Sequence, residues 1–547
     1  MRRILFLLAP GLLAFGAGCR DKSVAPNPRE PVTKSAAAPA PPEVAIALHF
    51  AGLEALSKNP AASKQAGMFQ APATRALVHA ALEKLAVAAT RGFATSSNAT
   101  AEFLAPMRPL LADIPTVESV VAVRGTAASE DWALALRLGP ARLAAWTNQL
   151  QTAVKKLPSP SWNLGLVRGV VHGDFGGADP KVRVKFQQVG DWLLFGGGPG
   201  KRALLEAWLA DAKSSGTPRP PLGADWLRVE AGPQLARLLD WPDLADWPHL
   251  TAGFSSRSDI VRTEARLSWR EPMVSSLQPW QVPTNTIRDP LVSFTAARGV
   301  APWLGRNAAL RTSAAGPVPD QWFSWSRSDI PFQTLFALPA KDAAARVPAL
   351  LQPLESAARA ALGTNFTGRI HHVTDRNEVV WSGLPILVPF VGVAPEPSGS
   401  FILGGLMSGI VPQGVNTNPA PAELLAQLGR TNLVYYDWEV TQFRLQQVRQ
   451  TRQLLQLLGG PGAGLMGRTP GQAWLDAIAP QLGNTITEAT IDGPKELRVI
   501  RNSHAGLTGF ELLMLARWLD NPDFPAWREP AAAFPGLPPV PSLPPGK

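Results

Sequence analysis

The sequence predicts an α+β protein with two related halves, each built as a mainly antiparallel β-sheet with helices packed on one face. Three observations lead to this expectation. Short segments alternate apolar and polar residues with the period of a half-buried strand, and longer segments between them repeat apolar residues every three or four positions. The order of these segments then recurs at an offset of about 200 residues, which is typical of an internal duplication.

The first half is expected at residues 43–275 and opens with a strand at 44–50 (VAIALHF). A helix is predicted at 72–90, where apolar residues share one face. The strand predicted at 132–138 is followed by a helix that begins at Pro140, a position that proline favours. Further strands are expected at 119–124, 167–175, 182–187, 192–195, 226–230 and 260–269.

The second half is expected at residues 289–522, after a linker at 276–288. Its segments repeat the earlier order: 291–296 corresponds to the first strand, 332–338 to 132–138, 369–382 to the 167–187 hairpin, 400–405 to 191–197, and 432–437 to 226–230. A strand pair at 486–502 and a helix at 511–519 are predicted to complete this half.

Both ends of the chain are rich in proline. Residues 19–42 hold almost no large apolar residues and are expected to form a disordered tether. The proline-rich tail at 523–547 carries a few apolar residues and is expected to be disordered or loosely docked. A polyproline II ligand for a partner and a segment lying along a groove of the body are the alternatives.

The N-terminus has the pattern of an export signal. Arg2 and Arg3 precede an apolar run at residues 4–15, which is too short to span a bilayer, since spanning needs about 20 apolar residues. Small residues follow, and the stretch at 12–19 (LLAFGAGC) ends in Cys19, the one cysteine of the chain. Residues 1–18 are therefore predicted to be a signal peptide.

This stretch resembles a bacterial lipoprotein signal. Ala17, Gly18 and Cys19 fit the small-small-cysteine end of a lipobox, while Gly16 stands where the family usually has leucine. The resemblance implies that Cys19 becomes the mature N-terminus and carries acyl chains that anchor the protein in a membrane. It implies an extracytoplasmic place in the cell envelope, at the outer membrane or the periplasmic face. The body is similar in general organisation to exported tandem α+β envelope proteins of unknown function.

Composition narrows the function further. Hydrophobic residues make up 46% and charged residues 17%, which is enough material for sizeable cores. The formal net charge is +10, but no run of five basic residues occurs, so no nucleic-acid partner is expected. A single cysteine leaves no internal disulfide framework and no thiolate metal cluster.

One glycine-rich turn lies between a predicted strand and a predicted helix, where backbone N–H groups can bind an anion. It departs from the P-loop pattern, because Phe195 and Arg202 occupy the positions of the first glycine and the Ser/Thr. A flexible turn is the favoured interpretation, and anion binding is a weak alternative. The candidate residues are Gly196, Gly197, Gly198, Gly200 and Lys201.

No metal site, cofactor or catalytic residue is predicted. His371, His372 and Asp375 lie close in sequence, but adjacent histidines on a strand point to opposite faces. The preferred function is a non-enzymatic binding or scaffold module whose partner is an envelope protein or a glycan. The alternatives are an extracytoplasmic hydrolase acting on glycan or peptide, and an apolar-ligand carrier. The apolar run at 383–393 is interpreted as a buried loop, or else as an exposed patch.

Overall fold

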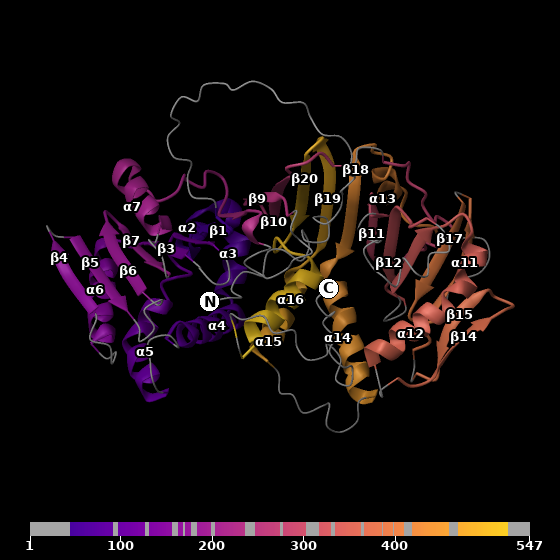
Figure 1. Cartoon of the computed structure of the whole chain (residues 1–547), viewed down its shortest axis with the longest axis horizontal. Helices are drawn as coiled ribbons and strands as arrows, with labels where there is room; N and C mark the ends of the chain where they lie inside the picture. Colours follow the sequence, from indigo (N-terminus) through magenta and orange to yellow (C-terminus); the bar gives the residue numbers. More distant parts are fainter. Residues whose placement is uncertain are drawn as a thin grey trace, which may run out of the picture. The chain divides into compact units, whose positions relative to one another are not determined.

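A computed structural model of the chain (Figure 1) describes residues 44–90, 97–125, 131–155, 162–167, 170–176, 183–198, 203–235, 247–273, 277–301, 317–329, 334–362, 366–384, 387–397, 399–409, 418–458, 469–522 and 524. The predicted signal peptide, Cys19, the tether and nearly all of the proline-rich tail lie outside these residues. The chain divides into two compact units. The first is Met1–Glu271 with Arg517–Trp527, and the second is Pro272–Ala516 with Arg528–Lys547.

The first unit is built on an antiparallel sheet. Its described strands are β1 (Ile46–Phe50), β2 (Ser119–Arg124), β3 (Asp131–Arg137), β4 (Trp162–Val167), β5 (Val170–Gly176), β6 (Arg183–Val189), β7 (Trp192–Gly197), β8 (Leu227–Ala231), β9 (His249–Arg257) and β10 (Ile260–Ser268). They pair in the order β4-β5-β6-β7-β3-β2-β1-β8-β9-β10. The helices of this unit are α2 (Leu53–Lys58), η1 (Pro60–Ala62), α3 (Ser63–Gln70), α4 (Pro72–Thr90), α5 (Ser97–Leu111), α6 (Pro140–Val154) and α7 (Ala203–Ser215).

The second unit is also built on antiparallel strands. Its described strands are β11 (Leu291–Arg298), β12 (Gln321–Arg327), β13 (Thr334–Pro339), β14 (Arg369–Val373), β15 (Glu378–Ser382), β16 (Phe390–Glu396), β17 (Gly399–Gly405), β18 (Leu433–Val440), β19 (Asn484–Gly493) and β20 (Glu496–Ser503). They pair in the order β14-β15-β16-β17-β13-β12-β11-β18-β19-β20. The helices are α11 (Ala343–Ala349), α12 (Leu351–Leu362), α13 (Ala422–Gln427), α14 (Thr441–Leu458), α15 (Pro470–Ile478), η4 (Ala479–Gln481) and α16 (Gly509–Asp520), within which the unit boundary falls.

Helices cover both faces of the first sheet at its middle strands. In α6, Leu143 and Trp146 pack with Leu136 of β3, whereas Leu205 and Trp208 of α7 pack with Ala135. Because consecutive strand residues point to opposite faces, α6 and α7 lie on opposite sides of β3. The expectation of helices on one face is therefore not confirmed. An apolar strand such as β7, buried along its whole length, needs cover on both sides.

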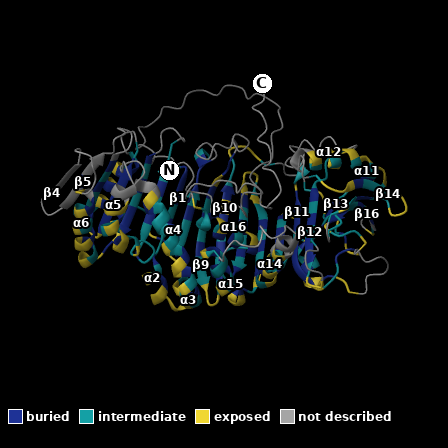
Figure 2. Ribbon diagram, turned by 90° about the horizontal axis from the view of Figure 1, so that it is seen from below, coloured by how far each residue is buried: buried dark blue, intermediate teal, exposed yellow. Residues whose placement is uncertain are grey.

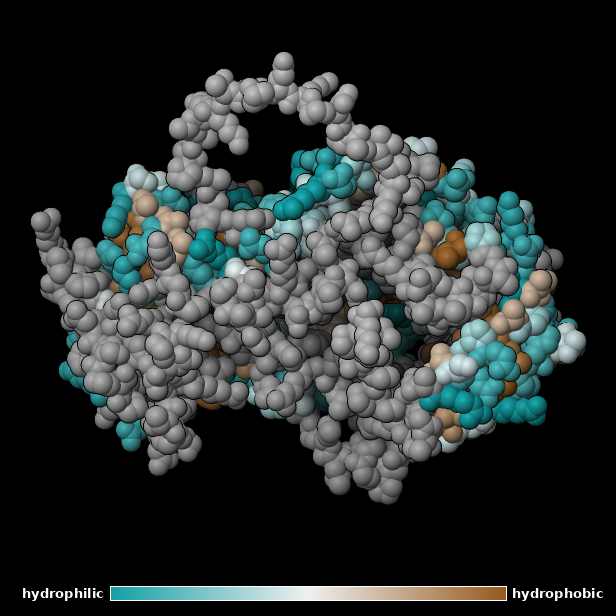
Figure 3. All heavy atoms as spheres, in the orientation of Figure 1, coloured by the Kyte–Doolittle hydropathy of each residue, from teal (hydrophilic) through white to brown (hydrophobic). Residues whose placement is uncertain are grey.

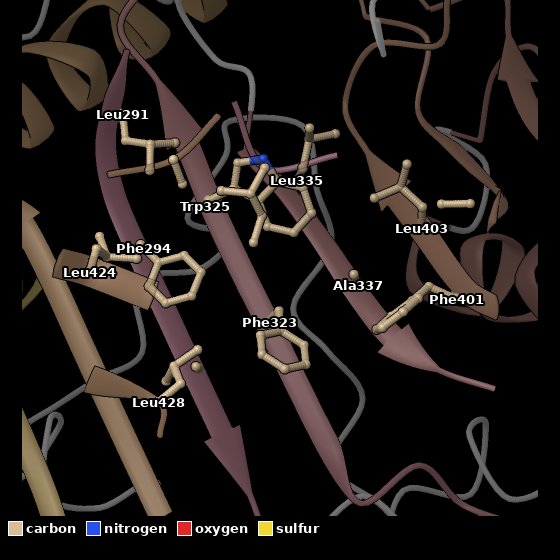
Figure 4. Packing of buried hydrophobic residues seen from close by; sticks show 14 of the residues in the cluster. Leu291, Phe294, Phe323, Trp325, Leu335, Ala337, Phe401, Leu403, Leu424 and Leu428 are labelled. Carbon is tan, nitrogen blue, oxygen red and sulfur yellow. The ribbon is translucent and has the colours of Figure 1, made fainter. Parts of the chain in front are cut away.

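The second sheet is covered in the same way. Leu424 of α13 packs in the core that contains Ala337 and Leu403, and Figure 4 shows part of this core from close by. Val347 of α11 packs instead in the cluster around Ile402, which points to the other face. Strands are mostly buried and the outer surfaces of the helices exposed, as the colours in Figure 2 show. The α+β class is thus confirmed, with antiparallel pairing in the described strands.

Several boundaries differ from the expectation. The strand expected at 167–175 is β5, which begins three residues later, and the strands β4, β9, β12 and β16 were not anticipated. Part of the run at 383–393, expected as a buried loop, forms β16, whose first residue Phe390 lies in the core. The range 276–288 was expected to be a linker, but two of its apolar side chains pack in the second unit. Ile287 lies in the core, and Trp280 is partly buried against it.

Candidate functional site

The glycine-rich turn has a packing role at its described positions. Gly196 and Gly197 end β7, and an added Cβ on Gly196 would lie 2.5 Å from Leu205 Cβ of α7. On Gly197 it would lie 2.6 Å from the Trp132 ring. Glycine is required here because a helix and an indole ring approach the strand backbone closely. Gly198 follows with φ of 143°, a conformation that favours glycine, while Gly200 and Lys201 lie outside the described residues.

We expect Gly196→Ala to lower the free energy of unfolding by about 1–3 kcal/mol, because the methyl group has to displace α7. The control is Gly67→Ala in α3, where nothing lies within 4 Å, and we expect that change to raise stability by up to about 1 kcal/mol. Thermal unfolding of the two variants measures both effects. A Gly196→Ala protein that is fully stable but loses phosphate binding would instead support the anion site.

The paired histidines are separated by the sheet. His372 Nε2 lies 3.0 Å from Asn377 Oδ1, whereas His371 Nδ1 lies 3.5 Å from Ser382 Oγ, and consecutive residues of β14 point to opposite faces. Among the residues that the structure describes, no three His, Cys, Asp or Glu side chains are placed to hold one metal ion.

A small polar hollow lies over β1 and β8 in the first unit. Its volume is about 30 Å³, which is room for about one water molecule, and its lining includes His49, Arg219, Arg228 and Glu230. Both arginines have a carboxylate partner, since Arg219 bonds to Glu230 and Arg228 to Asp225. His49 Nε2 lies 2.9 Å from Glu118 Oε1, just outside the lining. The hollow is therefore a set of paired polar side chains over the middle strands of the sheet rather than a substrate cleft.

The second unit contains a buried polar network that sequence reasoning did not identify. Every second residue of β18 points to one face of the sheet, and on that face these residues are Tyr435, Asp437 and Glu439. The opposite face of the strand packs into the apolar core. Side chains from β11, β19, β20 and the starts of α14 and α16 meet them. We call the following residues the buried network: Thr295, Tyr435, Asp437, Glu439, Thr441, Thr485, Thr487, Arg501 and Glu511.

The two β18 carboxylates have perturbed acidities. Burial, and then the charge of Glu439, raise the pKa of Asp437 to about 7, although its Oδ1 accepts a 2.6 Å hydrogen bond from Thr295. Burial also raises the pKa of Glu439, against the effect of the hydrogen bonds that it accepts from the Gly509 N–H and the Thr441 hydroxyl. Burial raises the pKa of Tyr435 well above its usual value.

A buried ion pair joins β20 to α16. Arg501 donates to both carboxylate oxygens of Glu511, at 2.7 and 3.1 Å, and the two side chains are 7% and 3% exposed. Burial by itself lowers the pKa of Arg501, but the charge and hydrogen bonds of Glu511 outweigh it and raise that pKa. Glu511 also accepts from the Thr508 N–H, and Thr508 Oγ1 accepts from the Glu511 N–H, which closes a capping box at the start of α16.

The network fixes the first turns of two helices against each other. Glu439 Oε1 accepts a 2.6 Å hydrogen bond from the N–H of Gly509, the first residue of α16. An added Cβ on Gly509 would lie 3.4 Å from Cγ of Arg444, in the first turn of α14. Arg444 in turn donates to Ser326 Oγ of β12, at 3.2 Å. Both helix starts are therefore held to the sheet by polar contacts as well as by packing.

Two aromatic side chains on these turns face solvent. Phe510 is 58% exposed and Phe443 is 46% exposed, the largest values among the described large apolar residues. Phe443 precedes Arg444 and Phe510 follows Gly509, and Arg444 and Gly509 are the two residues through which the turns approach each other. On the face drawn in Figure 3, the described surface is mostly hydrophilic, with small brown areas between. We call Phe443 and Phe510 the aromatic pair.

The comparisons with known proteins add no assignment to this geometry. No family model matches the chain, and neither curated proteins nor solved structures show significant similarity to it. Within the described parts of the chain, no helix is long and apolar enough to cross a membrane.

Proposed function

We propose that the protein is a membrane-tethered extracytoplasmic lipoprotein that acts as a non-enzymatic binding or scaffold module in the cell envelope. The aromatic pair is its binding surface, and an envelope protein or a glycan is its partner. The observation that carries the binding role is the exposure of Phe443 and Phe510 on two helix starts that a buried network holds in place. Rigidly held aromatic rings bury a large apolar area at a small cost in conformational entropy.

The tether rests on the sequence at Cys19, and intact mass tests it. Protein extracted from membranes of the producing cells is expected to lack residues 1–18 and to carry the mass of acyl chains on Cys19. A Cys19→Ser variant is expected to carry none and to leave the membrane fraction. Membrane-derived protein that keeps its first eighteen residues, with no acyl mass, would contradict the tether.

The binding role is tested by a paired replacement at the aromatic pair. We expect the Phe443→Gln/Phe510→Gln protein to lose the envelope component that the wild-type protein retains on a column, by about tenfold or more in affinity. Leu354→Gln is the control, because Leu354 is an exposed apolar residue on a different helix, α12. Equal retention by all three proteins would contradict the proposed surface.

We also infer that the two halves arose by duplication of one unit. What supports this is the strand order. When the ten described strands of each unit are numbered from the start of that unit, they pair in the same order in both units. A helix follows the third and the seventh strand in both units, on opposite faces. Both seventh strands end in a glycine pair, Gly196-Gly197 and Gly404-Gly405, against bulky side chains.

Hydrolysis is the second candidate, and one observation favours it. A carboxyl group with a pKa of about 7, such as that of Asp437, is suited to general acid or base catalysis. Asp437 is buried, so a substrate would reach it only if α16 moved away from Glu439. Turnover of a glycan or peptide substrate that Asp437→Asn abolishes would establish this alternative.

A further inference from the structure

Three arginines are buried among the residues that the structure describes, each with 4–6% of its surface exposed: Arg298, Arg346 and Arg501. Two of them have several partners. Arg501 forms the ion pair with Glu511. Arg298 donates to four backbone carbonyls and stacks on Trp280, 4.7 Å from the ring centroid. A guanidinium without partners is costly in a protein interior, so a buried arginine requires contacts of this kind.

Arg346, in α11, is the exception. Its Nη1 donates to the Pro317 carbonyl at 3.1 Å, whereas its Nε is enclosed and has no acceptor in the described structure. It forms no ion pair with any described Asp or Glu, and Asp342, one helical turn earlier, is exposed. Arg346 lies in the last turn of α11, where the helix dipole favours a cation, but that dipole amounts to about half a charge and gives Nε no acceptor.

The surrounding chain has no further carboxylate to offer. Between residues 272 and 516, none of the residues outside the described set is Asp or Glu. Every carboxylate side chain of this range is therefore placed in the structure, and none of them pairs with Arg346. A water molecule can accept a hydrogen bond from Nε, but only an anion also neutralises the buried charge. An anion from outside this range is therefore the partner that Arg346 requires.

The free part of the guanidinium has the shape that an oxyanion fits. The Nε–H and one Nη2–H point the same way from one edge of the planar group, and two oxygens of a carboxylate or a phosphate accept such a pair of bonds. The Pro317 carbonyl holds Nη1 on the other side and so fixes the orientation of the group. Pro317 is exposed, so this contact lies close to the protein surface.

We propose that Arg346 is an oxyanion-binding residue, whose Nε and Nη2 receive a carboxylate or phosphate group of a ligand while the Pro317 carbonyl holds Nη1. The ligand class is a molecule that carries such a group. The site lies on α11 and uses neither Phe443 nor Phe510. It is therefore independent of the proposed binding surface and goes beyond it.

Calorimetric titration of the full-length protein tests this, in a chloride buffer that holds no oxyanion. Inorganic phosphate and acetate are titrated separately at constant ionic strength, and the tighter of the two identifies the preferred group. We expect the wild-type protein to bind at least one of them, and Arg346→Met to bind it at least about tenfold more weakly. Arg359→Met, at an exposed arginine of α12, should bind as the wild type does.

Thermal unfolding gives a second readout. In the oxyanion-free buffer, we expect Arg346→Met to unfold at the same temperature as the wild type or higher, because it removes an unpaired buried charge. The ion that binds should raise the melting temperature of the wild type and not that of the variant. Arg346→Lys keeps the charge without the fork, so it should bind about tenfold more weakly and answers the question if Arg346→Met does not fold.

Three results would overturn the inference. The first is that neither phosphate nor acetate binds the wild-type protein. The second is that the wild type and the Arg346 variants bind with equal affinity. The third is a melting temperature of Arg346→Met well below that of the wild type in the oxyanion-free buffer, because it would mean that the guanidinium already has its full set of partners.

Discussion

Replacing Arg501 by methionine is expected to lower the free energy of unfolding by about 3–5 kcal/mol, because it leaves the buried Glu511 carboxylate without its cation. The change also removes the bonds from Arg501 to the Thr487 hydroxyl and the Gly506 carbonyl. Denaturant unfolding measures the loss. Arg359→Met is the matched control: Arg359 pairs with Glu355 on the surface of α12 and is 61% exposed, so its removal should cost less than about 1 kcal/mol.

A second variant separates the ion pair from simple loss of packing. In Arg501→Met/Glu511→Gln, the residue at position 511 no longer carries the buried charge that Arg501 neutralises, so we expect the double variant to be more stable than Arg501→Met alone. If Arg501→Met costs no more than Arg359→Met, the ion pair does not hold α16 on the sheet. The aromatic pair would then lack the support that the account assigns to it.

Asp437→Asn is expected to change how stability depends on pH. The pKa of Asp437 is raised from 3.8 to about 7 in the folded protein. The neutral carboxyl is therefore the form that folding favours. Its contribution to the free energy of unfolding is fully present below about pH 4 and is lost as pH rises to 7. At about 1.4 kcal/mol per pKa unit, the wild-type protein is expected to lose about 4 kcal/mol of its free energy of unfolding over this pH range. Asparagine does not ionise and avoids that loss.

The two proteins differ in this one group, and because Asp437 interacts with Glu439, the difference between them reports the titration of that pair. The groups that face Asp437 are Thr295, Glu439, Arg501 and Glu511. We expect Asp437→Asn to unfold at a higher temperature than wild type at pH 8 and to lose that advantage at pH 4.5. If the difference in melting temperature between the two proteins stays the same across this pH range, folding does not raise the pKa of Asp437.

Much of the sheet was predictable from residues that alternate. The predicted strand at 132–138 is β3 within one residue, and the helix at 72–90 is α4, since the spacing of apolar residues reports burial directly. β16 was missed because two prolines interrupt a uniformly apolar run there. β9 was missed because its sequence, HLTAGFSSR, combines glycine and serine, which are more common in turns.

The candidate site was less predictable. The spacing of Asp437 and Glu439 was a usable signal, because carboxylates two residues apart in a strand share one face. Whether that face is buried depends on α16, which comes about seventy residues later in the chain. For Phe443 and Phe510 the sequence holds no signal. An aromatic residue in the first turn of a helix is buried or exposed according to what packs on it.

Cross-linking in intact cells tests the binding surface most directly, because the protein stays anchored and meets its own partners. A photoreactive amino acid at position 510 of the full-length chain is compared with one at position 354, on α12. We predict that irradiation joins position 510 to one defined envelope protein or glycan, and that position 354 gives no such product. A product at both positions, or at neither, would contradict the claim that the aromatic pair is the binding surface.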